Sequence, residues 1–453
     1  MKTTLITLSL LLALQFVFAQ EWGGPFHPNP NAVPCLTETD YKFYHERVSE
    51  NIAKLERSGK LQQFKPNTIV NFIWPVQAAP GTQYNSVWSI SNYVDHDSAS
   101  NSLSDYNCGT RTYDTSSGYD HQGVDIFTWP FWWKQMEDDA AQIVAAAPGQ
   151  IIYKNDGSGD RNCSFNNDLW NAVYVQHSDG SVAWYGHMKE NSLTGKNVGD
   201  TVSQGEVLGI VGSSGNSTGP HLHFEVYDNG PNLIDPYAGP CNTLNTESWW
   251  ATQRPYINPG INAVLTHTAL PDFGSCPETE ITFEENQFAP GDTVYLGSYF
   301  KDQQPGTTAV NTVYDPNGNV HTSWNRNFTQ FYYASWWVSN TVVSSVEGDW
   351  VYEVAYNGET VSHVFTVGAL GTAENNPLGL KAFPNPATDK ITIEAAQPLE
   401  TIVVYDVLGK LLDRISLNGA FSKTINLSGY GPGVYFLKVA NGSASGTVSF
   451  VKR

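Results

Sequence analysis

Two short segments of this chain place ligand-type side chains at alternating positions, and this spacing requires extended backbone. One is His121-Gln-Gly-Val-Asp125 and the other is His221-Leu-His223. Residues two apart on a strand point to the same face, whereas a helix would turn them by roughly 200°. Two neighbouring strands could therefore gather all four side chains at one point, and Gly123 would leave room between His121 and Asp125.

The chemistry of these side chains is that of a hydrolytic metal site. Two imidazoles and one carboxylate suit a borderline-soft divalent ion, and catalytic zinc typically keeps three protein ligands and one open position. Such an ion lowers the pKa of water and polarises a carbonyl oxygen. Histidine moves protons well near pH 7. His187, in Tyr185-Gly-His187, and one member of the His221/His223 pair are the candidates for that role.

The segment from about residue 72 to 237 resembles the lysostaphin/LytM-type zinc metalloendopeptidases, metallopeptidase family 23. Its matching motifs are His-x-x-x-Asp, a mid-domain Tyr-x-His and Thr218-Gly-Pro-His-Leu-His-Phe-Glu225. The resemblance implies that one Zn²⁺ is the cofactor, with metal ligands and catalytic groups in separate roles. The ligands it implies are His121, Asp125 and His223, and the residues it implies for catalysis are His187 and His221.

The resemblance predicts a zinc metalloendopeptidase in which two histidines assist a metal-activated water. The expected substrate is a peptide bond in peptidoglycan cross-links or stem peptides. Two alternatives stay open: the same chemistry on a glycine-rich extracellular protein such as elastin, or a non-catalytic LytM-like binding or regulatory protein. The aromatic and acidic stretch Trp129–Asp139 departs from the family pattern and leaves substrate preference open. The run Phe127–Trp133 is more typical of core or loop packing than of a surface that binds substrate.

Both ends of the chain indicate export. Lys2, the apolar run Leu5–Phe18 and the small residue Ala19 predict a signal peptide over 1–19. The block 380–453 resembles the C-terminal sorting domain of the type IX secretion system, the Por secretion domain. Its matching segments are Phe383-Pro-Asn-Pro-Ala387, Tyr405-Asp-Val-Leu-Gly409, Leu427-Ser-Gly-Tyr-Gly-Pro-Gly-Val-Tyr-Phe436 and Val451-Lys-Arg453. This resemblance implies a Gram-negative host, passage through the periplasm, and release outside the cell or attachment to its surface.

Alternation of apolar and polar residues predicts an all-β, multidomain chain. The expected parts are a lead segment (20–65), a mainly antiparallel LytM-type domain (66–245), an immunoglobulin-like sandwich (246–368), a linker (369–379) and a small sorting sandwich (380–453). The lead segment should hold a helix from Glu38 to Gly59 with Thr37 as a possible cap. This helix is interpreted either as part of a pro-segment covering the cleft or as a helix packed on the enzyme domain.

The composition of the chain restricts the kinds of partner that it can bind. The net charge of −20 disfavours nucleic acid and anionic membranes, and no other apolar run could span a bilayer. A monomer is expected, with the secretion machinery and the substrate as its partners. Five cysteines suit an oxidising compartment and leave one unpaired; we expect Cys108 to pair with Cys163. His177 is expected at a hairpin turn, and His267 belongs to no cluster.

Overall fold

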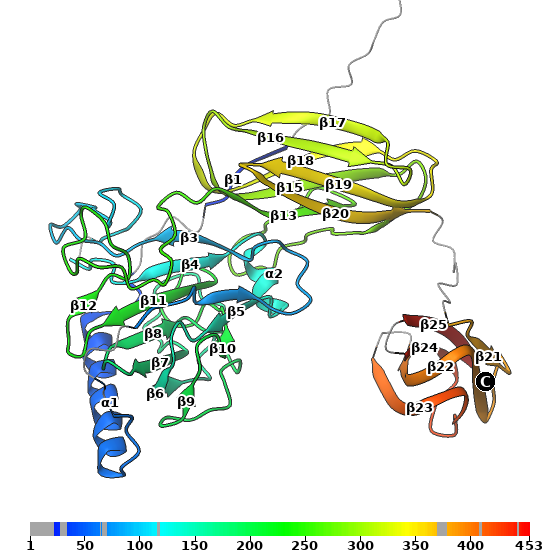
Figure 1. The fold of residues 1–453 in the computed structure, drawn as a ribbon, viewed down its shortest axis with the longest axis horizontal. Helices are drawn as coiled ribbons and strands as arrows, with labels where there is room; N and C mark the ends of the chain where they lie inside the picture. Colours follow the sequence, from blue (N-terminus) through cyan, green and yellow to red (C-terminus); the bar gives the residue numbers. More distant parts are fainter. Residues whose placement is uncertain are drawn as a thin grey trace, which may run out of the picture. The chain divides into compact units, whose positions relative to one another are not determined.

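The computed structural model describes residues 22–27, 34–63, 65, 70–115, 118–368, 378–406, 410–441 and 444–453 (Figure 1). The predicted signal peptide and most of the predicted linker lie outside these residues. The chain divides into two compact units, one ending at Gly368 and the other at Arg453. Strands dominate both units, so the predicted all-β class is confirmed.

An eight-stranded antiparallel sheet carries the segments with the histidines. Its order is β3-β4-β11-β8-β7-β6-β9, with β12 paired to β11. One face packs against a small sheet, ordered β10-β5-β2, around a shared hydrophobic core. The strands of both sheets are β2 (Val76–Ala78), β3 (Trp88–Asn92), β4 (Val124–Thr128), β5 (Ala141–Val144), β6 (Gly149–Asn155), β7 (Ala172–His177), β8 (Val182–Gly186), β9 (Thr201–Val202), β10 (Val207–Ile210), β11 (His221–Tyr227) and β12 (Leu233–Ile234).

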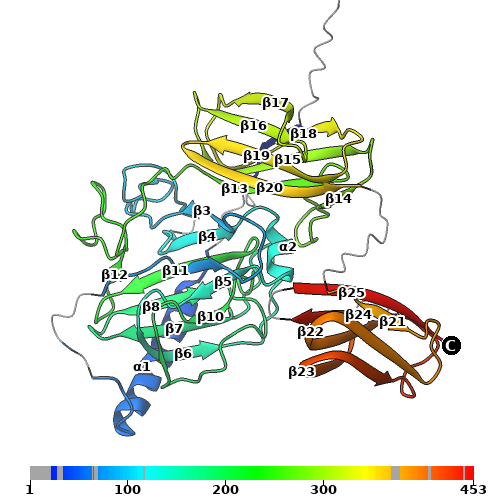
Figure 2. The same cartoon turned by 45° about the vertical axis from the view of Figure 1, so that its right-hand side comes forward.

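The predicted helix in the lead segment is present as α1 (Glu38–Arg57) and covers the other face of this sheet (Figures 1 and 2). Thr37 and Asp40 form a reciprocal capping box at its start, which confirms the predicted cap. Tyr44, Val48 and Leu55 are buried from α1 in a cluster with aromatic residues of β6, β7 and β8. The central strands are therefore buried on both faces.

Residues 260–367, together with residues 22–25, form two further sheets, and strands of both contribute to a second core. One sheet has the order β1-β18-β15-β13 and the other β14-β20-β19-β16-β17. The edge strand of the first of these sheets, β1, comes from the lead segment, and its Trp22 pairs with Val338 of β18. The immunoglobulin-like topology stays a prediction. The strands are β1 (Trp22–Pro25), β13 (Gly260–His267), β14 (Gln287–Phe288), β15 (Thr293–Gln303), β16 (Thr308–Tyr314), β17 (Val320–Asn327), β18 (Tyr332–Val342), β19 (Gly348–Tyr356) and β20 (Glu359–Val367).

The aromatic stretch after Asp125 joins these two β domains into one unit. It ends in the short helix α2 (Trp132–Glu137), and its rings are buried against Ala263, Leu265 and Tyr299 of the second domain. Trp129 also donates a hydrogen bond from Nε1 to the carbonyl of Phe300 at 3.1 Å. The expectation of core packing is therefore confirmed, and these rings are not an exposed surface for substrate.

The second unit has its own hydrophobic core and five strands. The order is β21-β22-β24-β25, and β23 pairs with the other side of the long strand β22. A separate core allows this unit to fold independently of the first. The strands are β21 (Lys381–Phe383), β22 (Lys390–Asp406), β23 (Leu411–Asn426), β24 (Gly433–Asn441) and β25 (Ala444–Lys452).

The predicted Cys108–Cys163 disulfide is wrong. Cys108 pairs with Cys241 and Cys163 pairs with Cys276, with Cα–Cα distances of 5.1 and 6.0 Å. The loop before Cys108 packs against the turn that carries Cys241, because the ring of Tyr106 stacks on Tyr237 and the Tyr106 carbonyl accepts from the Cys241 amide. Such long-range loop packing cannot be derived from cysteine spacing. Cys35 is the cysteine left unpaired.

Candidate metal centre

Two adjacent strands bring the predicted ligands together. β4 and β11 run antiparallel with His223 directly opposite Asp125, and on its other side His223 lies opposite Gly186 of β8. His121 lies just before β4. A Cβ atom on Gly123 would lie 2.6 Å from the His223 ring, so the glycine is what lets that ring lie beside Asp125. Gly123 thus leaves room in the cluster, but for the ring of His223 rather than only between His121 and Asp125.

The donor atoms of these three residues converge at one point. His121 Nε2 lies 3.0 Å from Asp125 Oδ2, His223 Nδ1 lies 2.9 Å from Asp125 Oδ1, and the two nitrogens are 3.3 Å apart. Bonds of about 2.0–2.2 Å around a tetrahedral zinc would separate its ligand atoms by roughly 3–4 Å. All three side chains are buried. The N₂O donor set and its spacing therefore fit a divalent metal.

The remaining nitrogen of each candidate ligand, His121 and His223, is held by a hydrogen bond to the surrounding protein. His121 Nδ1 donates to the Tyr93 carbonyl at 2.7 Å, and His223 Nε2 lies 2.9 Å from Glu225 Oε2. The hydroxyls of Tyr227 and Tyr41 in turn donate hydrogen bonds to the Glu225 carboxylate. Metal-binding histidines characteristically use their second nitrogen in this way, because it fixes the tautomer and orients the ring.

His187 and His221 lie beside this group with their rings 4.4 Å apart. Each donates from Nδ1 to a backbone carbonyl, His187 to Ser214 at 2.6 Å and His221 to Gly219 at 2.8 Å. His221 Nε2 lies 3.6 Å from Asp125 Oδ1. His187 Nε2 is buried and has no hydrogen-bond partner among the described residues. Both rings therefore direct Nε2 away from the scaffold.

The backbone at His187 is in a conformation that non-glycine residues rarely adopt. Its φ is +59°, at the point where the chain leaves β8. The residue before it must be glycine, because a Cβ on Gly186 would lie 2.4 Å from the ring of Trp170. This turn sets the His187 ring against Trp170, with the ring centres 5.0 Å apart. The strained turn therefore places the imidazole next to His221.

Local charges separate the pKa values of these buried groups. Burial disfavours the charged form of every ring, yet the Asp125 carboxylate outweighs it at His121 and raises the pKa of that histidine to about 9. Burial is likewise outweighed by Asp125 at His221, whose pKa is raised. At His187 burial dominates and neighbouring His221 adds to it, so the pKa is lowered.

Sequence reasoning missed two residues of this site. Glu225 continues the alternation of 221 and 223 on β11, so the period-two rule could have found it. Cys35 was not singled out, because the odd number of cysteines predicted only that one of the five would stay unpaired. Its Sγ and one donor atom from each of the three candidate ligands all lie within 4.8 Å of one another. The Tyr113 hydroxyl lies 3.2 Å from this sulfur, and the Tyr113 ring stacks on His121.

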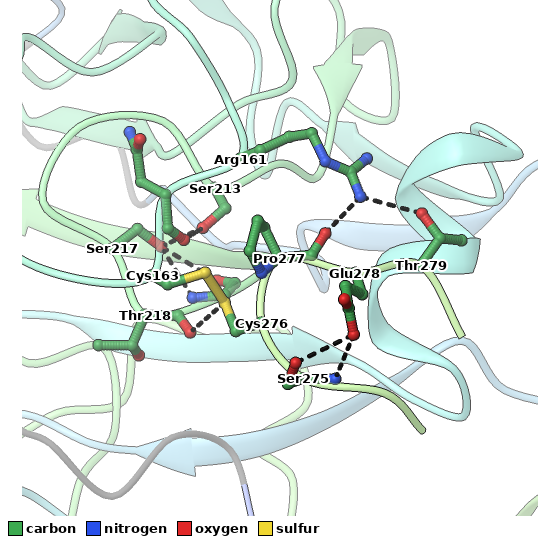
Figure 3. Close-up of a disulfide and its surroundings, with 12 residues drawn as sticks. Arg161, Cys163, Ser213, Ser217, Thr218, Ser275, Cys276, Pro277, Glu278 and Thr279 are labelled. Carbon is green, nitrogen blue, oxygen red and sulfur yellow. Dashed lines mark hydrogen bonds between the residues drawn. A yellow bond between two sulfur atoms is a disulfide. The ribbon is translucent and has the colours of Figure 1, made fainter. Parts of the chain in front are cut away.

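The glycine-rich loop before His221 is fixed by the second domain. Ser213 and Ser217 are buried and share a hydrogen bond of 2.8 Å between their hydroxyls. Figure 3 shows the Cys163–Cys276 disulfide beside this loop, with Cys276 Sγ 3.6 Å from the Thr218 carbonyl. The loop that carries Gly219, the hydrogen-bond acceptor of His221, is thereby held in place.

The other histidines considered in the sequence lie outside the cluster. His177 ends β7 at a hairpin turn, as predicted, and donates from Nδ1 to the Pro148 carbonyl at 2.9 Å. His267 is buried on β13 in the second domain, where both of its nitrogens have partners. The structure therefore brings together the five residues singled out from the sequence motifs and leaves these two apart.

Residues 119–236 match peptidase family M23, and residues 381–453 match the secretion system C-terminal sorting domain. The chain carries an M23 peptidase domain and a type IX sorting domain. Both resemblances seen in the sequence are therefore confirmed. The sorting domain implies export, to the cell surface or beyond it. Among the described residues, no helix is long and apolar enough to cross a membrane.

Curated relatives match short parts of this chain. The DD-carboxypeptidase/endopeptidase Mpg of Neisseria meningitidis is 40% identical over 88 residues, 19% of this chain and 17% of that protein. The peptidoglycan DD-endopeptidase ShyC of Vibrio cholerae is 37% identical over 67 residues, 15% of each. The chain thus spans less than a fifth of the length of either relative. Among solved structures, a catalytic-domain variant of the prophage-encoded M23 protein EnpA from Enterococcus faecalis is 30% identical, covering 30% of this chain and 86% of that one, with a TM-score of 0.21.

Proposed function

We propose that this protein is an exported zinc metalloendopeptidase that hydrolyses peptide bonds in peptidoglycan. The observation that carries the proposal is the convergence of His121 Nε2, Asp125 and His223 Nδ1 within 3.3 Å of one another, with the outer nitrogens of both histidines held by the scaffold. These three residues would hold one Zn²⁺. When bound, the ion would supply a water of lowered pKa and polarise the carbonyl of the scissile bond.

His187 and His221 are proposed to move the protons. Because each Nδ1 donates to a carbonyl, each neutral ring has its lone pair on Nε2. A ring in this tautomer can take a proton from the attacking water and return it to the leaving amine. Their Nε2 atoms face the same region from neighbouring positions, so one can act as base while the other donates. Such positioned transfer contributes typically about 10²–10⁴ in rate.

The choice of peptidoglycan is supported by the names of two relatives and by export. The Neisseria and Vibrio proteins are described as a DD-carboxypeptidase/endopeptidase and a peptidoglycan DD-endopeptidase. The sorting domain at residues 381–453 implies export, and an exported enzyme would have access to the cell walls of other cells. We propose that the exported form loses 1–19 and the block after the linker, with release or surface attachment as the outcome. Intact mass of the protein from culture medium tests this processing.

The test of substrate uses the full chain, loaded with zinc, and its Cys35→Ala variant, because the thiol lies at the site. Each is incubated with purified cell walls and, separately, with elastin, and the products are identified by mass spectrometry. We expect muropeptides with new peptide termini, and none from a His223→Ala chain prepared in parallel. Cleavage of elastin alone would favour the glycine-rich alternative. Zinc binding without cleavage of either substrate would favour the non-catalytic one.

A further inference from the structure

The thiol of Cys35 lies between the candidate ligands and the candidate catalytic histidines. Its sulfur is within 4.8 Å of a donor atom on each of His121, Asp125 and His223, and also within 4.8 Å of a ring nitrogen on His187 and His221. Cys35 is thus the donor that the two groups share. In a catalytic zinc site this is the region that must stay open for water and substrate.

The thiol is held there by buried contacts. Cys35 and Leu36 are each 3% exposed, and the Tyr113 hydroxyl lies 3.2 Å from the sulfur. The capping box of Thr37 follows at once and starts α1. The position of Cys35 is therefore coupled to the position of the helix.

The helix is in turn fixed to the sheet that carries the site. Asn51 donates to the Ile152 carbonyl at 2.9 Å, and the Tyr44 hydroxyl accepts from the Trp170 amide at 3.4 Å. The Tyr41 hydroxyl donates to Glu225 Oε2, the oxygen that also contacts His223. A helix that served only to cover apolar strands would not require a thiol among five ligand-type side chains. The arrangement instead points to a segment built to reach the metal.

We propose that Cys35 is a fourth protein ligand of the metal and that residues 34–57 are an inhibitory segment. This inference rests on the proposed function, since it needs the metal site. Cysteine binds zinc as the thiolate, so metal binding would release the thiol proton to solvent. Four protein donors close the coordination shell in the manner of structural zinc sites and leave no position for water. The chain is therefore a latent enzyme until Cys35 is withdrawn.

A cobalt spectrum tests the ligand directly. Co²⁺ is loaded into the metal-free full chain, and the thiolate-to-cobalt charge-transfer band in the near ultraviolet is recorded with the cobalt content. The band has one possible source, since the other four cysteines are in disulfides. We expect the band in the unaltered chain and its loss in Cys35→Ala, with cobalt still bound by the three remaining donors. The matched control is Leu36→Ala, which alters the neighbouring buried residue and should keep the band.

Activity tests the inhibition. With zinc bound, the full-length Cys35→Ala chain should lyse cell walls about 10–100-fold faster than the unaltered chain, if the closed state makes up about 90–99% of the population. The double variant Cys35→Ala/His223→Ala should lose this gain, which would assign it to the metal site rather than to a loosened fold.

The two proposals fail in different ways. If cobalt binds but the unaltered chain shows no charge-transfer band, or the band survives Cys35→Ala, Cys35 is not a ligand and the inference falls alone. The inference also falls alone if both chains bind zinc and lyse walls at the same rate. If neither chain binds metal, the proposed function falls and takes the inference with it.

Discussion

The His267 ring on β13 is buried, as are the histidines around Asp125, but the groups that surround these rings differ. His267 has partners on both nitrogens, the Thr282 carbonyl at 2.8 Å and the Tyr299 hydroxyl at 2.9 Å. No carboxylate offsets its burial, and its pKa is lowered to about 3. His121 instead gives one nitrogen to the scaffold and the other to Asp125, and its pKa is raised to about 9. Burial of a histidine therefore does not by itself indicate a metal site. What distinguishes the cluster around Asp125 is that several donor atoms converge on one point.

The largest expected effect is the loss of a ligand. Made in the Cys35→Ala background, like its control, His223→Ala removes one of the three remaining donors, so both zinc content and peptide hydrolysis should collapse. Elemental analysis and the rate of wall lysis on the same preparation measure this. His177→Ala is the control, because that ring is buried on the same sheet but bonds Pro148 outside the cluster. Equal loss of metal in both variants would show that folding, not ligation, had been disturbed.

Next in size is the loss of a proton-transfer group. His187→Ala and His221→Ala each leave the three ligands in place, so zinc content should stay near that of the unaltered chain. Hydrolysis by the Cys35→Ala background should fall by about 10²–10⁴. Should either variant lose its metal as completely as His223→Ala, the division into ligands and catalytic groups would be wrong.

A smaller effect, on zinc affinity, is expected from changing Glu225, which contacts His223 Nε2. Glu225→Gln keeps the size of the side chain but removes the negative charge beside His223 Nε2. Zinc affinity should fall by about 10–100-fold, the range for outer-shell partners of metal-binding histidines. Competition with a chromophoric chelator measures the affinity. An unchanged affinity would mean that Glu225 serves packing alone.

The smallest effect concerns stability and sharpens the comparison at His267. Its folded pKa is about 3, below that of the unfolded chain near 6.5, so the unfolded state binds the proton first as pH falls. The stabilisation is complete above pH 6.5 and is lost as pH falls toward 3. At pH 5 this loss should lower the free energy of unfolding by about 2 kcal/mol. Denaturant unfolding at pH 7 and pH 5 should show this loss, and His267→Gln should reduce it.

Local rules predicted much of the candidate site and part of the fold. The alternation in His221–His223 predicted a strand, and β11 pairs with β4 so that His223 lies opposite Asp125. Of the other motif, only Val124 and Asp125 lie in β4, and His121 precedes the strand. The capping box of Thr37 was predictable because both of its partners lie within four residues. These features depend on residues that are close together in the sequence, so local patterns are enough to predict them.

Features that depend on packing between distant segments were missed. Cys35 contacts Tyr113 across 78 residues, and the disulfide from Cys163 spans 113. Strand β1 pairs with β18 of the second domain, although it belongs to the lead segment. No local periodicity encodes such contacts, because they arise from which buried surfaces fit together. The position of the thiol at the site therefore required the structure.

The most direct test of the account is the location of the metal. Crystals of the zinc-loaded full chain are measured at the zinc absorption edge, and an anomalous difference map is calculated. We expect one peak between His121 Nε2, Asp125 and His223 Nδ1, with the Cys35 sulfur also in contact and with His187 and His221 outside bonding distance. A peak centred between His187 and His221, or none in this cluster, would contradict the account.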